Sequence, residues 1–264
     1  MIFFDETKPN KYNYLKKHLV PHKFDLKKRK YGNGDGGYVL AEDLIELDSN
    51  YILSYGVGDD PKGVSFETTM SRDGDRIHCY DGSIEKFPVK NVGDISFFKE
   101  NLTSKNFQKH INRLGGSLPD IRLIDHSVLK MDIEGHEYEW LTGKNLKLLS
   151  ENFSQFTVEV HSLIEEVPEG WVLETQLAEA KKDKKTKEDF FKNLNKHFYL
   201  YHIHANNHSP RCVDFPDCLE LTYINKNAGY DPVGIDDTRF PIEGLDEANF
   251  KGVPDYVLDW WIFD

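Results

Sequence analysis

Short apolar runs alternate with helical segments along most of this chain, and this alternation constrains the fold more than any other feature of the sequence. Runs typical of buried strands cover residues 50–55, 76–80, 95–98, 127–133 and 156–160. Helical segments are expected between them, at 64–71, at 106–114 and in the HEYEWL sequence at 136–141. Strands that alternate with helices form βαβ units, which assemble into a parallel sheet. The pattern therefore predicts an α/β fold with a doubly wound, mainly parallel sheet.

The last third of the chain predicts that one edge of this sheet is not parallel. Helices are expected at 171–180 and 188–195, followed by strands at 198–204 and 219–224. A loop with two prolines, and no helix, joins these two strands, so we expect an antiparallel pair at one edge of the sheet. Residues 227–253 are rich in Gly, Pro and Asp, which predicts irregular chain that packs on the core.

The composition is that of a globular protein with an acidic surface. Hydrophobic residues make up 39% of the 264 residues and aromatic residues 13%, which is too many core-forming side chains for a disordered chain. The length suits one large domain or two small ones. The formal net charge is −12. Because binding to a phosphate backbone requires a basic surface, nucleic acid is not expected as a partner.

The cysteines and the apolar segments favour a reduced, soluble protein. Cys79, Cys212 and Cys218 are odd in number and lack CxxC spacing, which disfavours a disulfide scaffold and a four-cysteine zinc site. The opening apolar run at 1–4 is too short for a signal peptide. No stretch approaches the roughly 18 apolar residues of a membrane span. We therefore expect a cytoplasmic protein.

Three segments are expected along the chain: an N-terminal cap at 1–49, a core at 50–226 and a C-terminal extension at 227–264 packed on that core. The charged run at 178–189, AEAKKDKKTKED, is compatible with a solvated helix face and with a flap over a site. Nothing in the sequence specifies an oligomeric state.

A Gly-x-Gly turn follows the strand at 50–55. Gly56 and Gly58 let the backbone turn sharply and let a ligand approach the main chain, and Asp59 follows them directly. Asp81 ends the next strand, 25 residues after Gly56. An acid at that place can accept hydrogen bonds from a ribose diol, beyond the carboxyl ends of the strands. NAD and S-adenosylmethionine (SAM) both carry such a ribose, and a plain turn with a solvated aspartate is the alternative.

A second glycine-rich segment lies near the start of the chain. Gly32, Gly34 and Gly37 spell GxGxxG, and the sequence DGGY occupies 35–38. No apolar strand precedes these glycines and no clear helix follows them, so the context of a dinucleotide-binding loop is missing. A hairpin turn before a short strand is the alternative.

Acids and a histidine follow two neighbouring strands. Asp132 and Glu134 lie in the sequence LKMDIEGHE, while Glu159 and His161 share one face of the strand at 156–160. Because neighbouring strands lie about 4.8 Å apart, Asp132, Glu159 and His161 can converge. Such a group can hold Mg²⁺ or Mn²⁺, or can accept a proton. Ordinary strand positions, and a helix cap at Glu134, are the alternatives.

Taken together, these segments resemble the FkbM-like class I methyltransferases, in the branch with an N-terminal DGGYV element. The resemblance extends over residues 30–224, in DGGYV at 35–39, SYGVGDD at 54–60, SFE at 65–67, YD at 80–81, LKMDIEGHEYEWL at 129–141 and VEVH at 158–161. Ser54 stands where many class I methyltransferases carry an acid. The resemblance implies a SAM-binding, Rossmann-like sheet of seven strands with an antiparallel last strand. The cofactor contacts expected from it are Asp35, Gly36, Gly37, Tyr38, Gly56, Gly58, Asp59, Asp81 and Asp132.

The resemblance also implies O-methyl transfer, with a sugar hydroxyl as acceptor in a nucleotide-linked sugar or a surface polysaccharide. The expected partner is thus a small molecule or glycan with a free hydroxyl. The acceptor must lose a proton as the new bond forms, so Asp132 and His161 are the candidate catalytic residues. With Glu159 they are also the candidate ligands of Mg²⁺ or Mn²⁺. A nicotinamide-dependent sugar oxidoreductase or epimerase and a non-catalytic nucleotide-binding module are the alternatives.

Overall fold

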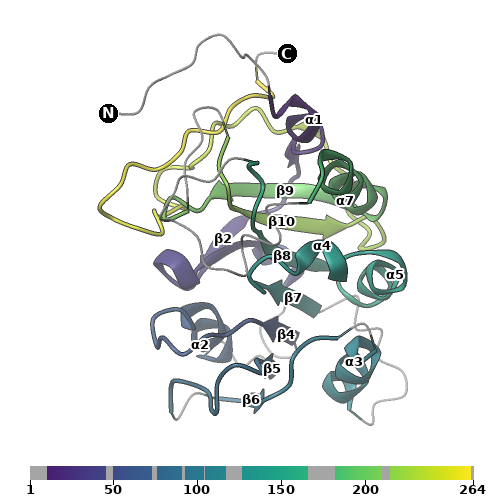
Figure 1. Cartoon of the computed structure of the whole chain (residues 1–264), viewed down its shortest axis with the longest axis vertical. Helices are drawn as coiled ribbons and strands as arrows, with labels where there is room; N and C mark the ends of the chain where they lie inside the picture. Colours follow the sequence, from purple (N-terminus) through teal and green to yellow (C-terminus); the bar gives the residue numbers. More distant parts are fainter. Residues whose placement is uncertain are drawn as a thin grey trace.

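A seven-stranded sheet runs through the centre of the protein in the computed structural model (Figure 1). The structure describes residues 11–45, 50–72, 76–90, 93–103, 105–116, 127–165, 182–209 and 215–262. The strands of the sheet are β4 (Tyr51–Tyr55), β5 (Arg76–Tyr80), β6 (Ile95–Phe98), β7 (Ser127–Met131), β8 (Gln155–Val160), β9 (Phe198–Ala205) and β10 (Leu219–Asn225).

The order of the strands across the sheet is β6-β5-β4-β7-β8-β10-β9. The strands from β4 to β8 pair in parallel, whereas β10 is antiparallel to both β8 and β9. The predicted Rossmann-like sheet, mainly parallel with an antiparallel last strand, is confirmed. The strand order reverses between β4 and β7, which places the switch point of the sheet between these two strands.

Helices lie near the predicted segments 64–71, 106–114, 136–141 and 188–195, whereas the helices Asn13–Lys16 and Gly143–Asn152 were not expected from the sequence. The helices are α1 (Asn13–Lys16), α2 (Ser65–Arg72), α3 (Phe107–Gly115), α4 (Glu137–Trp140), α5 (Gly143–Asn152) and α7 (Lys184–His197). The helix expected at 171–180 lies outside the described residues. Of the charged run, 182–189 is described and leads into α7, which agrees with the interpretation as a helix face.

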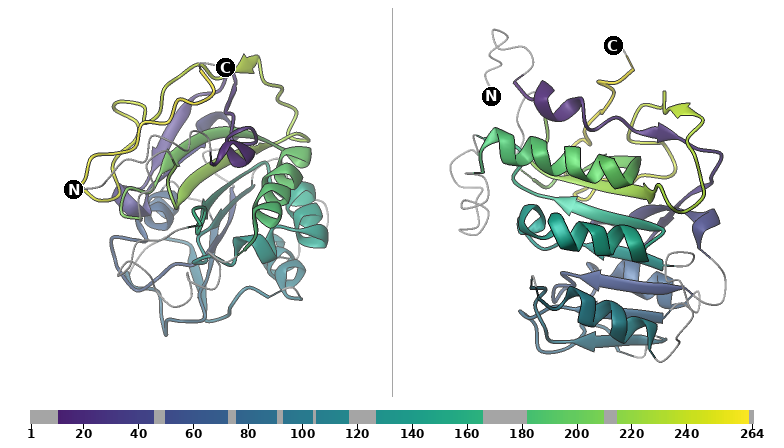
Figure 2. Two further views of the ribbon diagram at one scale, coloured as in Figure 1. Left: turned by 45° about the horizontal axis from the view of Figure 1, so that its top comes forward. Right: turned by 90° about the vertical axis from the view of Figure 1, so that its right-hand side faces the viewer.

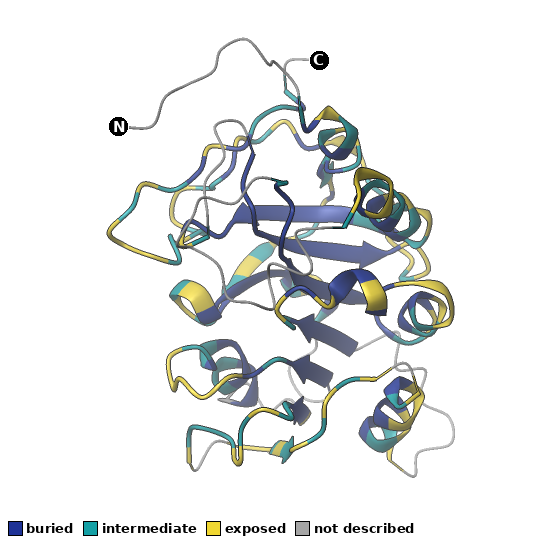
Figure 3. Cartoon of the chain, in the orientation of Figure 1, coloured by how far each residue is buried: buried dark blue, intermediate teal, exposed yellow. Residues whose placement is uncertain are grey.

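One face of the sheet is mostly apolar, and the other is apolar at β4 and β5 but carries buried polar side chains at β8, β9 and β10. Side chains alternate along a strand, so Leu53 and Tyr55 pack with the core under α3, α5 and α7, while Ile52 packs with the core under α2. Figure 2 (right) shows α7, α5 and α3 side by side in front of the sheet. The central strands are buried and the surrounding loops are largely exposed (Figure 3).

A small hairpin carries the early glycine-rich segment. The strands β2 (Lys28–Tyr31) and β3 (Tyr38–Ala41) are antiparallel, and the GxGxxG sequence lies in the connection between them. The hairpin interpretation of this segment is therefore confirmed. The backbone N–H of Ala41 donates to the side-chain Oε1 of Gln155 at 2.9 Å, and Nε2 of Gln155 donates to the carbonyl of Ala41 at 3.0 Å. These two hydrogen bonds attach the hairpin to β8. The segment boundaries at 49 and 226 stay predictions.

Residues 227–262 form mostly irregular chain, apart from β11 (Gly234–Ile235), which pairs with β1 (His22–Lys23). Two histidines of β9 attach this chain to the sheet. His202 Nε2 lies 2.8 Å from Asp246 Oδ1, and His204 lies between Glu220 of β10 at 2.8 Å and Asp255 at 3.0 Å. Among the described residues, no helix has the length and apolar character needed to cross a lipid bilayer.

The attachment through His204 predicts a pH-dependent stability. Burial opposes the charging of His204, but the carboxylates of Asp255 and Glu220 outweigh it and raise its pKa to about 10. This value lies above the ordinary 6.5. The stabilisation that the charged His204 gives to the folded state is therefore complete below about pH 6.5 and is lost as the pH rises toward 10. We expect His204→Gln to lower the free energy of unfolding by ~3 kcal/mol near pH 6, as for a broken buried ion pair, and by much less near pH 10. Chemical denaturation at both pH values measures the difference.

The matched control is an exposed ion pair that also reaches the C-terminal chain. Lys23 Nζ lies 3.3 Å from Asp237 Oδ1, and both side chains are mostly exposed. Lys23→Ala should therefore change the free energy of unfolding by less than ~1 kcal/mol. An equal loss of stability at both pH values for His204→Gln would show that the charge on His204 does not hold the C-terminal chain.

Candidate functional site

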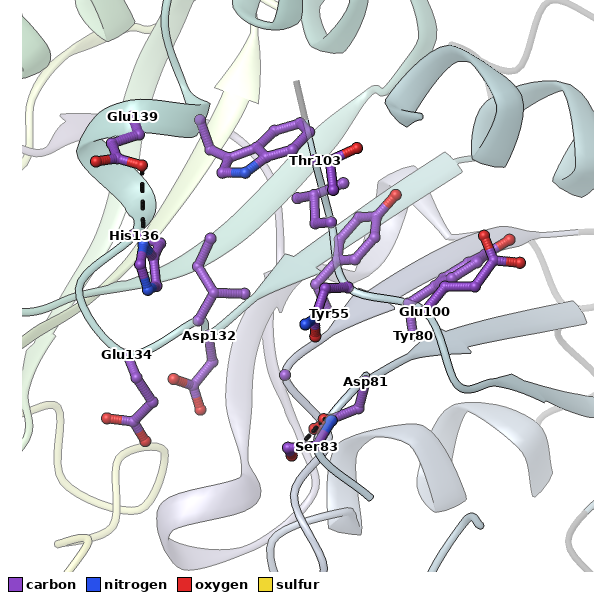
Figure 4. Close-up of a pocket in the computed structure, with 15 residues that line it drawn as sticks. Tyr55, Tyr80, Asp81, Ser83, Glu100, Thr103, Asp132, Glu134, His136 and Glu139 are labelled. Carbon is purple, nitrogen blue, oxygen red and sulfur yellow. Dashed lines mark hydrogen bonds and ion pairs between the residues drawn. The ribbon is translucent and has the colours of Figure 1, made fainter. Parts of the chain in front are cut away.

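A cavity of about 570 Å³ opens beyond the carboxyl ends of β4, β5, β6 and β7 (Figure 4). Its lining comprises Tyr55, Gly56, Tyr80, Asp81, Ser83, Glu100, Asn101, Leu102, Thr103, Asp132, Ile133, Glu134, His136, Glu139 and Trp140. Ligands of open α/β sheets bind at this edge, next to the switch point of the strand order. Of the predicted cofactor contacts, Gly56, Asp81 and Asp132 line this cavity.

The loops that follow β4 and β7 pack backbone to backbone at Gly56. Gly56 has a φ of +71°, and a Cβ atom there would lie 1.4 Å from the carbonyl oxygen of Asp132. The N–H of Asp132 donates to the carbonyl of Tyr55 at 3.1 Å. Only glycine permits this approach, so the Gly-x-Gly turn determines where Asp132 stands beside the cavity.

Asp81 holds the Gly-x-Gly turn from the neighbouring strand. Its Oδ2 accepts hydrogen bonds from the N–H groups of Val57 at 3.1 Å and Gly58 at 2.9 Å. Its Oδ1 accepts from the N–H of Ser83 at 2.8 Å and from the Ser83 hydroxyl at 2.5 Å. Burial opposes ionisation, but these hydrogen bonds lower the pKa of Asp81. Gly58 and Asp59 are exposed and do not line the cavity, so their contact with a cofactor stays a prediction.

His161 lies at the centre of a cluster of carboxylates next to this cavity. Its Nδ1 is 3.3 Å from Oε1 of Glu137. Its Nε2 is 3.6 Å from Glu159 Oε1, 3.7 Å from Glu134 Oε2 and 3.9 Å from Asp132 Oδ1. The structure thus brings together Asp132, Glu159 and His161, which the strand pattern places on neighbouring strands.

Burial and crowding raise the pKa values of Asp132, Glu159 and His161, whereas at Glu137 the charge of His161 and hydrogen bonds outweigh burial and lower the pKa. Burial raises the pKa of Asp132 to about 6, although Lys130 and His161 act in the opposite direction. Burial and the charge of Asp132 raise the pKa of Glu159 well above its usual value. Burial opposes protonation of His161, but Glu137 and the other carboxylates raise its pKa well above its usual value. Asp132, Glu159 and His161 therefore keep their protons to a higher pH than the isolated side chains would.

The DGGY element at 35–38 lies beside Glu159 and is not in the lining of the cavity. The side-chain amide of Asn206 donates to both Asp35 Oδ1 at 3.2 Å and Glu159 Oε1 at 2.7 Å. The Tyr38 hydroxyl lies 3.5 Å from Glu159 Oε2. The element therefore contacts the carboxylate cluster at Glu159. A direct contact of Asp35, Gly36, Gly37 or Tyr38 with a cofactor stays a prediction.

Three buried charged residues of the site were not expected from the sequence. Lys130 of β7 donates to the carbonyl of Gly56 at 2.7 Å, and its Nζ lies 3.8 Å from Asp132. Glu67 of α2 is hydrogen bonded to Ser54. A carboxylate from the helix therefore reaches the position of Ser54, where many class I methyltransferases carry an acid. Glu137 is the third. A lysine inside an apolar strand was the signal for Lys130, whereas the partners of Glu67 and Glu137 depend on the packing of separate elements.

Comparison with known proteins identifies the family. The chain matches the sequence model of the methyltransferase FkbM domain over residues 24–230. No curated protein sequence matches it. A TehB-like SAM-dependent methyltransferase from Corynebacterium glutamicum is 11% identical over 69% of this chain and 82% of that chain, with a TM-score of 0.36. The fibrillarin of Aeropyrum pernix, solved with natively bound SAM, is 11% identical over 69% of this chain and 68% of that chain, also with a TM-score of 0.36.

These two structural similarities are too weak to carry an argument about the site. The match to the FkbM domain is different, because it extends from the start of the β2–β3 hairpin through all seven strands of the sheet. The chain therefore belongs to the FkbM methyltransferase family.

Proposed function

We propose that this protein transfers the methyl group of SAM to a hydroxyl group of a sugar, in a nucleotide-linked sugar or a surface polysaccharide. The observation that carries the proposal is a single cavity at the switch point of the sheet that contains Gly56, Asp81 and Asp132. Family membership supports methyl transfer as the reaction, and the cavity has the size of a small-molecule site.

The donor is proposed to bind with its ribose at Asp81. Gly56 has no side chain, so the ligand can approach the main chain of the turn. The four hydrogen bonds that Asp81 accepts keep it ionised and aimed at the turn. A ribose diol would take the place of the Ser83 hydroxyl on Oδ1, while the bonds to Val57 and Gly58 remain.

The proposed reaction is an in-line displacement at the methyl carbon of the sulfonium. The acceptor oxygen forms the new C–O bond, the C–S bond breaks, and its electron pair stays on sulfur in S-adenosylhomocysteine. The hydroxyl proton passes to a base. Asp132 is proposed for this role because it lines the cavity and its side chain is 25% exposed there. His161, 3.9 Å away, is proposed to position this carboxylate.

A sugar is the proposed acceptor because hydroxyl-rich ligands suit the polar groups of the lining. Glu100, Asn101 and Thr103 follow β6 along one side of the cavity, opposite Asp132 and Glu134. The choice of a sugar over other alcohols draws on the family resemblance.

The direct test is incubation of the protein with labelled SAM and a panel of nucleotide sugars and capsule fragments. The methyl group is then located by mass spectrometry, and we expect it on a sugar oxygen. Transfer to nitrogen or carbon, or to alcohols that are not sugars, would contradict the proposed acceptor. Calorimetry that shows binding of NAD and none of SAM would contradict methyl transfer itself.

Asp81→Ala is expected to weaken SAM binding by roughly tenfold or more, since hydrogen bonds to a charged group are lost. Calorimetric titration with SAM measures the effect. Glu85→Gln is the control, because Glu85 also follows β5 but is exposed and pairs with Lys99 outside the cavity. Wild-type affinity in Asp81→Ala would remove the ribose assignment.

Asp132→Asn is expected to lower kcat by ~10²–10⁴-fold, the usual contribution of a general base. Its affinity for SAM should stay close to that of the wild type, because the amide keeps the shape of the side chain. Glu85→Gln changes an exposed carboxylate outside the cavity and should keep its kcat. Steady-state kinetics with the acceptor identified in the labelling experiment compare the wild type with the two variants. An unchanged kcat in Asp132→Asn would exclude this residue as the base.

A further inference from the structure

The Nε2 atom of His161 faces three carboxylates at distances longer than a hydrogen bond. Glu159, Glu134 and Asp132 lie 3.6, 3.7 and 3.9 Å from it, whereas an N–H···O bond rarely exceeds ~3.2 Å. Two ligands that each lie about 2.1 Å from one cation can be as far as ~4.2 Å apart. The spacing around Nε2 therefore fits ligands of a shared ion.

Asp132 provides a second, independent observation. Its Oδ1, the atom that faces Nε2, is buried and has no hydrogen-bond partner. Lys130 lies on the other side of the carboxylate, 3.8 Å from Oδ2. A buried acceptor without a donor destabilises the fold, and a cation at Oδ1 would remove that penalty.

Glu137 holds the imidazole in the orientation that a ligand requires. Its side chain is fully buried, and its Oε1 lies 3.3 Å from His161 Nδ1. The same oxygen accepts from the N–H groups of Ile133 and Gly135 at 3.2 Å each. Histidines that bind metals usually donate the other ring N–H to a carboxylate or carbonyl. With Nδ1–H directed at Glu137, the lone pair of Nε2 points toward Asp132 and Glu134.

The backbone of Glu134 has a conformation that is typical of functional sites. Glu134 has a φ of +56°, a conformation that is uncommon outside glycine and that clusters at functional sites. In this conformation the carboxylates of Asp132 and Glu134 point the same way from the loop after β7 (Figure 4). The two carboxylates and His161 each place one ligand atom within 4.8 Å of the others.

Glu159 is less suited to bind an ion, although it was expected from the sequence to be a ligand. Its Oε1 accepts from Asn206 at 2.7 Å and from the Cys218 thiol at 3.0 Å, and its Oε2 lies 3.5 Å from the Tyr38 hydroxyl. Asn206 and Cys218 already occupy Oε1, the oxygen that faces His161 Nε2, so Glu134 takes the place of Glu159 in the ligand set.

We propose that Asp132, Glu134 and His161 bind one divalent cation at the edge of the cavity, with Glu137 orienting the imidazole. Two carboxylates and one imidazole, without a thiolate, suit Mn²⁺ or Mg²⁺. The positive charge offsets the carboxylates that crowd around His161. The site rests on the geometry of these side chains and does not depend on the proposed acceptor or on methyl transfer.

The test is a titration of the chelator-treated full chain with Mn²⁺, followed by electron paramagnetic resonance. We expect one saturable site per chain and a nitrogen coupling from His161 in pulsed spectra. Glu134→Gln changes a side chain that is 58% exposed, so the fold should tolerate it. This variant and Asp132→Asn should each weaken Mn²⁺ binding by roughly tenfold or more.

Glu139→Gln is the matched control. Glu139 also lines the cavity, is 62% exposed and faces His136 at 3.8 Å, but it lies outside the ligand set. The proposal is overturned by the absence of saturable Mn²⁺ binding, by a spectrum without nitrogen coupling, or by an equal loss of binding in Glu139→Gln. Calorimetry with SAM on the same samples keeps the two proposals apart, because a chain that binds Mn²⁺ and not SAM would contradict the proposed function alone.

Discussion

The close approach of the Gly56 backbone to the carbonyl of Asp132 is the contact on which the site depends. It joins the loops of two neighbouring strands, β4 and β7, at the place where the strand order reverses. Any side chain at residue 56 would push these loops apart. Lys130 strengthens the same junction, since it donates to the Gly56 carbonyl and lies near the Asp132 carboxylate. The cavity and the position of Asp132 therefore follow from one backbone contact.

The two sides of the cavity differ in how completely their polar groups are bonded. On the β5 side, Asp81 accepts four hydrogen bonds from its own loop and the Gly-x-Gly turn, which hold its carboxylate in one position. On the β7 side, Asp132 has an unbonded oxygen, and the imidazole of His161 meets three carboxylates at long distances. Buried polar groups without a hydrogen-bond partner destabilise the fold, so the β7 side is where chemistry or an ion is expected.

The local parts of this account could be predicted from the sequence, and the long-range parts could not. The strand that ends at Gly56 and the period of two that aligns Glu159 with His161 are local patterns. By contrast, the pairing of His204 with Asp255 joins residues far apart in the chain, and no local pattern encodes it. The same holds for Glu137, whose partners depend on the left-handed turn at Glu134. The DGGY element was expected in the cofactor pocket from the resemblance, yet its contacts reach Glu159, directly from Tyr38 and through Asn206 from Asp35.

The cavity beside Gly56 is proposed to bind the methyl donor with its reacting end at Asp132. A crystal structure of the protein with S-adenosylhomocysteine tests this most directly. We predict electron density in the cavity, with the ribose hydroxyls within hydrogen-bond distance of Asp81 and the sulfur on the side of Asp132 and His161. Density elsewhere on the protein, or a ligand in the cavity with its ribose away from Asp81, would contradict the account.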